Sequence, residues 1–339
     1  MSQYVVTFGE MLIRLLPPGR LRFSQADSLD MFFGGAESNL AVSLGQWGLP
    51  VRYVTKLPDH WVGDGAIRYL QQYGVCTRHI ARGGPRMGLY FMERGASTLR
   101  SPKVVYDRSG SSFAAARTDD FDWKEALADA NWLHVTGITP AVGQLTSLQE
   151  AIKEAKRRHI PISLDLNYRA ALWSREEADR VMRPLIPDAD TIIGLDQDLI
   201  QGMGEQLLPN QPYAKRAEAI RRGLQQMEQR YGTGKVYLST LRNPISAARN
   251  QLSGYSLQNG EIRESALYDF EIVDRVGAGD AFAAGYIYAK QQGMEPQPCI
   301  EFAVAAAAMK HSIEGDANQV SVNEIQDFMA GERYGVVKR

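Results

Sequence analysis

The sequence Asp274-Arg275-Val276-Gly277-Ala278-Gly279-Asp280 stands between a segment typical of a buried strand, 270–273, and an alanine-rich segment from Ala281 that is typical of a helix. Glycines at a helix start let backbone N–H groups approach a bound anion, and the helix terminus adds partial positive charge. Asp280 can then accept a proton from a hydroxyl while the amides of 277–279 stabilise charge on a phosphoryl oxygen. A plain strand-to-helix turn with an aspartate N-cap is the alternative.

Apolar segments alternate with amphipathic helical segments through most of the chain. Strands are expected at 4–8, 51–54, 132–136, 160–165, 191–193 and 235–239, and helices at 40–47, 145–158, 175–185, 214–231 and around 303–308. Strands separated by amphipathic helices indicate βαβ units. The pattern predicts a three-layer α/β fold with a mostly parallel central sheet flanked by helices.

Two segments break this alternation. Residues 11–33 hold short strand-like pieces around Pro17-Pro18-Gly19, and residues 87–106 contain two further strand-like runs. We expect one domain, 1–339, with a small β-sheet lid formed by approximately 11–33 and 87–108. A lid over the carboxyl edge of the main sheet would exclude water from phosphoryl transfer. Because such a sheet has exposed edges, a homo-oligomer that pairs two lid sheets is also expected.

Composition excludes several classes of protein. The chain has 38 Lys and Arg against 39 Asp and Glu, a net charge of −1, which argues against nucleic acid or an anionic membrane as a general partner. Five histidines and two cysteines offer neither a zinc spacing nor a disulfide framework. The N-terminus lacks the basic start and apolar run of a signal peptide, and no stretch is long enough to span a bilayer. A soluble cytoplasmic protein is expected.

The glycine motifs fit neither of two common phosphate-binding patterns. In G-x-G-x-x-G the third glycine would stand where Phe282 is, and the Gly-Lys pair of a Walker A loop is found at Gly234-Lys235 without the required Ser or Thr. A second glycine pair lies in Phe33-Gly34-Gly35-Ala36-Glu37-Ser38-Asn39, before the helix expected at 40–47. It again allows close approach of a ligand, although a loop that needs positive φ is the alternative.

Gly34-Gly35-Ala36-x-x-Asn39 and Asp274-x-x-Gly277-Ala278-Gly279-Asp280-Ala281-Phe282 together resemble the two signatures of the ribokinase-like (PfkB) carbohydrate kinases. The resemblance covers nearly the whole chain. Within the family the sequence is most similar to the 2-keto-3-deoxygluconate kinases, through the segments 88–91, 106–111, 135–141, 165–169 and 313–316.

The resemblance implies a role for individual residues. Asp280 would be the catalytic base, with Gly277, Ala278 and Gly279 as the anion hole. The sugar site would be formed by Gly34, Gly35, Asn39, Tyr90, Tyr106, Arg108, Ile138, Arg169 and Asp316. The residues expected at the ATP phosphates are Asp165, Asn167, Asp198, Arg242, Gly277 and Gly279.

The chain departs from the family pattern near the phosphates. An N-x-x-E motif that organises magnesium in many members corresponds here to Gly194-Leu195-Asp196-Gln197-Asp198, with no Asn and an Asp in place of Glu. The metal ligands are therefore unknown, although ATP and Mg²⁺ are the implied cofactors, and a monovalent cation requirement stays open. Thr240-Leu241-Arg242-Asn243-Pro244 replaces a glycine-containing loop, so that Arg242 either reaches a phosphate or is a surface arginine.

Two arginines are relevant to the choice between an acidic and a neutral substrate. A planar guanidinium binds a carboxylate through two hydrogen bonds, so Arg108 and Arg169 in one pocket would favour a sugar acid over fructose or ribose. Each arginine alone is more often solvated or structural. The resulting hypothesis is ATP-dependent phosphorylation of 2-keto-3-deoxygluconate to 2-keto-3-deoxy-6-phosphogluconate. The alternatives are a kinase for fructose or 2-keto-3-deoxygalactonate, and a non-catalytic sugar or nucleotide sensor on the same fold.

Overall fold

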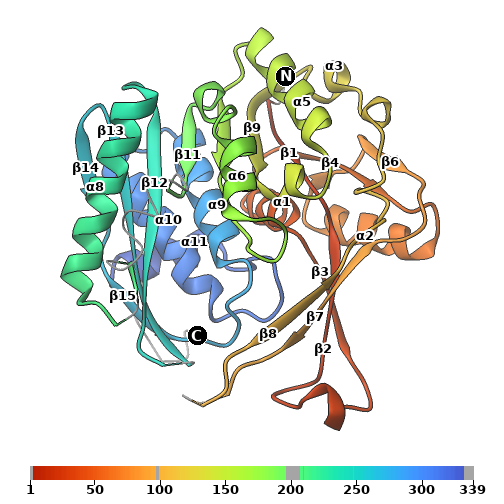
Figure 1. Cartoon of the computed structure of the whole chain (residues 1–339), viewed down its shortest axis with the longest axis horizontal. Coiled ribbons are helices and arrows are strands. Elements are labelled where there is room, and N and C mark those ends of the chain that lie inside the picture. Colours follow the sequence, from red (N-terminus) through yellow and green to blue (C-terminus); the bar gives the residue numbers. More distant parts are fainter. Residues whose placement is uncertain (1–2, 97–98, 196–206, 209, 247, 332–339) are drawn as a thin grey trace.

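The computed structural model describes residues 3–96, 99–195, 207–208, 210–246 and 248–331. Its main feature is an 11-stranded sheet with the order β14-β13-β12-β11-β10-β9-β1-β4-β5, to which β15 and β6 add at β13 and β4 (Figure 1). The strands are β1 (Tyr4–Phe8), β4 (Val51–Leu57), β5 (Val75–Cys76), β6 (Ile80–Arg82), β9 (Ala130–Thr136), β10 (Ile162–Asp165), β11 (Thr191–Ile193), β12 (Val236–Pro244), β13 (Arg249–Gln258), β14 (Glu261–Glu264) and β15 (Tyr268–Glu271).

Most of this sheet is parallel, as expected from the alternation of strands and helices. β1 pairs in parallel with β4 and β9, and the parallel pairing continues through β10 and β11 to β12. β13 then pairs antiparallel with β12, β14 and β15. The predicted three-layer α/β fold with a mostly parallel sheet is confirmed.

Helices cover both faces of the sheet. Val5 belongs to a core shared with α1, α2, α9, α10 and α11, whereas the next residue, Val6, belongs to a core shared with α5, α6 and α8. The α-helices are α1 (Ala36–Gln46), α2 (Trp61–Gln72), α3 (Trp123–Ala126), α4 (Ile138–Ala141), α5 (Leu145–Arg157), α6 (Arg175–Met182), α8 (Tyr213–Tyr231), α9 (Ala278–Gln291), α10 (Pro296–Lys310) and α11 (Val322–Met329). In the described parts of the chain, no helix has the length and apolar character needed to cross a membrane.

The alanine run expected at 303–308 lies in α10 and is buried along its whole length. Small side chains there let α9 approach closely, because a Cβ at Gly285 would lie 2.8 Å from the Cα of Ala303. On the sheet side, a Cβ at Gly254 would collide with Val304. This close packing holds α9, and with it Asp280, firmly against the sheet.

A separate four-stranded sheet has the order β3-β2-β7-β8, with β2 (Leu12–Leu16), β3 (Asp30–Gly34), β7 (Gly88–Glu93) and β8 (Lys103–Asp107). β2 pairs in parallel with β7 and antiparallel with β3, and β8 pairs antiparallel with β7. Figure 1 shows this sheet projecting from the main sheet at the lower right. The small sheet expected from the two irregular segments is confirmed, and its action as a lid remains a prediction.

One local expectation is wrong. The segment 270–273 is not a buried strand, because β15 ends at Glu271 and Val273 is 54% exposed. The segment 240–244, which replaces the glycine-containing loop of the family, belongs to β12, which continues to Pro244 in an uninterrupted pairing with β13. Both β12 and β15 pair with the antiparallel strand β13, and the βαβ pattern does not anticipate these pairings.

Candidate active site

A cavity of about 510 Å³ opens where the parallel strands end. Glu10 follows β1, Ile138 follows β9, Asn167 follows β10 and Gly194 follows β11, and all four line the cavity. The turn before α9 and strands of the small sheet form further parts of its wall. Ligands of α/β proteins bind at this edge of the sheet, because the loops there converge from several strands.

Most residues predicted for the site line this one cavity: Gly35, Asn39, Tyr90, Tyr106, Arg108, Ile138, Asp165, Asn167, Arg169, Arg242, Gly277, Ala278, Gly279, Asp280 and Asp316. Gly34 is not among the lining residues. A Cβ at Gly34 would collide with the carboxylate of Asp316, so this glycine makes room for that side chain. Asp198 lies outside the described residues.

The turn at 274–280, here called the transfer turn, is built to present backbone amides. Gly277 has φ 78°, and a Cβ there would collide with the backbone oxygen of Asp316. α9 begins at Ala278, directly after it. The first N–H groups of a helix have no intrahelical acceptor, so the amides of 278–280 are available to an anion.

Asp280 lies in the first turn of α9 and is held from the other side of the cavity. Asn39 of α1 donates a hydrogen bond from Nδ2 to Oδ2 of Asp280 at 2.7 Å. Burial raises the pKa of Asp280, and the hydrogen bond from Asn39 and the positive charge of Arg169 partly offset that effect. Asp280 therefore has the raised basicity expected of a proton acceptor.

The end of β10 places Arg169 in the cavity wall. Asn167 has φ 41°, and it donates from its backbone N–H to Asp165 Oδ1 at 3.0 Å and from Nδ2 to Oδ2 at 3.2 Å. This turn leads the chain from the strand to Arg169, which is exposed. Burial and the charge of Asp280 raise the pKa of Asp165 to about 7.

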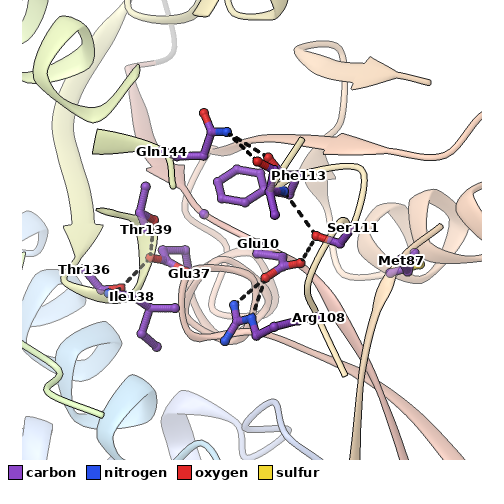
Figure 2. Close-up of polar contacts among 12 residues, drawn as sticks. Glu10, Glu37, Met87, Arg108, Ser111, Phe113, Thr136, Ile138, Thr139 and Gln144 are labelled. Carbon is purple, nitrogen blue, oxygen red and sulfur yellow. Dashed lines mark hydrogen bonds and ion pairs between the residues drawn. The ribbon is translucent and has the colours of Figure 1, made fainter. Parts of the chain in front are cut away.

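Arg108 differs from the expectation of a guanidinium that is open to a substrate carboxylate. Glu10 Oε2 accepts from Arg108 Nε at 2.7 Å and also from Nη2, and Ser111 donates to the other oxygen of Glu10 (Figure 2). Both partners of this ion pair are buried. Sequence reasoning missed Glu10, although an acid two residues after the first strand of a βαβ pattern was a usable signal.

Glu37 was quoted within the second glycine motif but not recognised as a site residue. It is buried, lines the cavity, and accepts hydrogen bonds at Oε1 from Thr136 at 2.7 Å and Thr139 at 3.2 Å (Figure 2). Burial raises the pKa of Glu37 to about 7, although the hydrogen bond from Thr136 opposes the shift. An acid within a glycine-rich helix start was the sequence signal that could have identified it.

An ion-pair network joins the small sheet to the transfer turn. Arg14 of β2 is fully buried, and its Nη2 lies 2.6 Å from Asp274 Oδ2 while its Nε lies 3.2 Å from Asp316 Oδ1. Tyr90 of β7 donates a hydrogen bond to Asp316. Asp316, expected to contact the sugar, is thus first a partner of Arg14 and Tyr90.

Residues 2–322 match the family described as pfkB family carbohydrate kinase. The chain belongs to the PfkB family. It is 43% identical to 2-dehydro-3-deoxygluconokinase from Thermotoga maritima, whose crystal structure superposes with a TM-score of 0.91 over 97% of this chain and 100% of that chain. It is 26% identical to 2-dehydro-3-deoxygalactonokinase from Haloferax volcanii, over 99% of both chains. It is 27% identical to 2-dehydro-3-deoxygluconokinase from Thermoproteus tenax, over 92% of this chain and 89% of that one.

The residues of this PfkB kinase fit a bound nucleoside triphosphate and Mg²⁺. Arg242 and Arg275 line the cavity together with Arg169. Desolvation lowers the pKa of Arg242, and the positive charges of Arg275 and Arg169 lower it further. Such a concentration of guanidinium groups suits phosphates. No group of three or more potential ligands for a metal exists among the described side chains. Mg²⁺ commonly takes only one or two protein carboxylates, with phosphate oxygens and water as its other ligands, and Asp165 can supply such a carboxylate.

The hydrogen bond between Asn39 and Asp280 gives this kinase a measurable pH signature. Asn39→Ala removes a donor that favours the charged form of Asp280, so its pKa should rise further. The acid limb of kcat/KM is then expected at higher pH, by about one to two units for one hydrogen bond to a charged group. Rates measured from pH 5 to 9 test this, with Gln46→Ala at the far end of α1 as the control. An unmoved acid limb would show that Asn39 does not tune the base.

Proposed function

We propose that this kinase phosphorylates 2-keto-3-deoxygluconate (2-dehydro-3-deoxygluconate) with ATP and forms 2-keto-3-deoxy-6-phosphogluconate. The observation that carries the proposal is the Arg169 guanidinium, which lines the cavity that holds Asp280. In the described structure Arg169 makes no ion pair with another side chain, so it is free for the carboxylate of a sugar acid. The names of the relatives from Thermotoga maritima and Thermoproteus tenax support the same substrate.

In the proposed reaction Asp280 accepts the proton of the sugar hydroxyl as that oxygen attacks the γ-phosphorus in line. The amides at the start of α9 stabilise the negative charge on the transferred phosphoryl group. Arg242 and Arg275 bind the phosphates of the donor. Mg²⁺, when bound, neutralises part of the charge on the phosphate oxygens.

The epimer 2-keto-3-deoxygalactonate is the second candidate substrate, because the relative from Haloferax volcanii bears that name. A coupled assay of ADP release over both epimers, fructose and ribose tests the proposal. We expect kcat/KM to be highest for a sugar acid. A higher kcat/KM for the galactonate epimer would change only which sugar acid is the substrate. A preference for fructose or ribose would contradict the proposed role of Arg169 in binding a carboxylate.

The small sheet is proposed to act as a lid, because Tyr90 and Tyr106 line the cavity from β7 and β8. Bound sugar acid should slow hydrogen exchange of backbone amides in β8, whose residues are all exposed. Arg14 already anchors β2, so a smaller change is expected there. Exchange followed by mass spectrometry with and without the sugar acid measures both segments. Equal protection of β8 in the two states would contradict a substrate-gated lid.

The same sheet is proposed to bind a second copy of the chain. Its exposed apolar side chains include Val105 at 65% and Met31 at 55% exposure. We expect a dimer in analytical ultracentrifugation, and Val105→Glu should shift it to monomer because a buried carboxylate is costly. Leu267→Glu, on an exposed residue outside this sheet, serves as the control. An unchanged sedimentation coefficient in Val105→Glu would place the interface elsewhere.

A further inference from the structure

Lys310 is a charged residue for which the proposed reaction has no use. It lies in the last turn of α10 and is 0% exposed. Its Nζ donates a hydrogen bond to the backbone oxygen of Ile313 at 2.9 Å, and no acid of the described structure forms an ion pair with it. Burying an ammonium with only one hydrogen bond costs desolvation free energy. Nearby negative charges must therefore offset that cost.

The segment that Lys310 fixes, 311–316, forms one side of the transfer turn. The backbone oxygen of His311 accepts from the N–H groups of Val273 at 2.8 Å and Asp274 at 3.1 Å. The N–H of Gly315 donates to Asp274 Oδ2 at 3.2 Å. The backbone oxygen of Asp316 packs against Gly277. A shift of 311–316 would therefore displace the amides that bind the transferred group.

The negative charges around Lys310 come from the transfer turn and from the segment 311–316 that packs against it. Burial lowers the pKa of Lys310 to about 8, whereas the charges of Asp274, Asp316 and Asp280 raise it and that of Arg14 lowers it. Three carboxylates and one guanidinium thus act on this ammonium. Backbone oxygens and carboxylates in such an arrangement are also the groups that bind a monovalent metal ion.

We propose that the Lys310 ammonium is a resident cation of the transfer turn, which holds residues 311–316 against 274–277 and makes phosphoryl transfer independent of K⁺ and Na⁺. Lys310 is a positioning residue, since it acts on the backbone of the turn and lines no part of the cavity. The proposal rests on the kinase activity but not on any particular sugar. A wrong substrate assignment would therefore leave it unaffected.

The first test uses the unmodified enzyme. Initial rates are compared in KCl, NaCl and tetramethylammonium chloride at one ionic strength, with the best acceptor from the sugar panel. We expect kcat to differ by less than about twofold among the three salts, since screening is held constant. Activation by K⁺ or Na⁺ well beyond that would overturn the proposal without any variant having to fold.

The second test uses two variants that differ in the space they leave. Lys310→Ala opens room for an ion, whereas Lys310→Met fills the volume without charge. Both should lower kcat by about tenfold, less than the loss of a direct oxyanion donor, with little change in KM. K⁺ or NH₄⁺ should restore part of the rate in Lys310→Ala but not in Lys310→Met.

Lys290→Met is the matched control, because Lys290 lies in the last turn of the neighbouring helix α9, and its kcat should equal that of the wild type. Thermal unfolding identifies variants that have lost their structure. Full kcat in both Lys310 variants, or a lost rate in Lys310→Ala that no monovalent cation restores, would reduce Lys310 to a structural role at the end of α10.

Discussion

Asp280→Asn is expected to lower kcat by about 10²–10⁴-fold, the usual contribution of general-base assistance. The amide cannot accept the proton of the sugar hydroxyl, yet it keeps the shape of the carboxylate. The amides at the start of α9 and the arginines that line the cavity are unchanged, so the Kd for ATP should remain close to that of the wild type.

Single-turnover rates measure the chemical step of this variant, and titration calorimetry measures its affinity for the nucleotide. Glu271→Gln is a suitable control, because Glu271 is an exposed acid at the end of β15, just before the transfer turn. A turnover of Asp280→Asn close to that of the wild type would exclude Asp280 as the base. Loss of ATP binding in the variant would instead indicate a disturbed turn.

Arg169→Ala is expected to raise KM for the sugar acid by about 10–150-fold, since a charge-assisted hydrogen bond contributes roughly 1.5–3 kcal/mol. Arg169 is exposed, so screening by solvent should bring the effect toward the lower end of that range. Arg169→Lys should recover only part of the affinity, because an ammonium cannot form two parallel hydrogen bonds with a carboxylate.

The measurement compares KM for a sugar acid, KM for a neutral sugar and KM for ATP in the same variants. Only the first should change strongly. Arg180→Ala, on the exposed face of α6, controls for a general loss of positive charge. If the wild type used fructose or ribose better than any sugar acid, the carboxylate hypothesis would fail and the carbohydrate kinase assignment would remain.

The elements that the sequence predicted well depend on local patterns. A short apolar run identified β1, and the structure shows why both of its valines are apolar, since Val5 and Val6 point into different cores. The run from Gly277 to Asp280 marked a strand-to-helix turn at which backbone conformation, helix polarity and an acid coincide. In each case the physical cause lies within a few residues of the chain.

What the sequence did not predict depends on pairs that are distant along the chain. Arg14 and Asp274 are 260 residues apart, and Glu10 and Arg108 are 98 apart. No periodicity or motif relates such partners, so Arg108 was expected to be free for substrate when it is already paired. The strand expected at 270–273 failed for a related reason, since the pairing of β15 depends on β13, whose place in the antiparallel part of the sheet is a tertiary property.

The burial of Arg14 constrains how the small sheet can be exchanged between relatives in chimeric enzymes. A graft that brought an uncharged residue to position 14 would leave the buried acids Asp274 and Asp316 without the guanidinium that pairs with both of them, which is strongly destabilising. β2 can therefore be recombined only together with these two acids. β8 makes no buried ion pair of this kind, because all five of its residues are exposed.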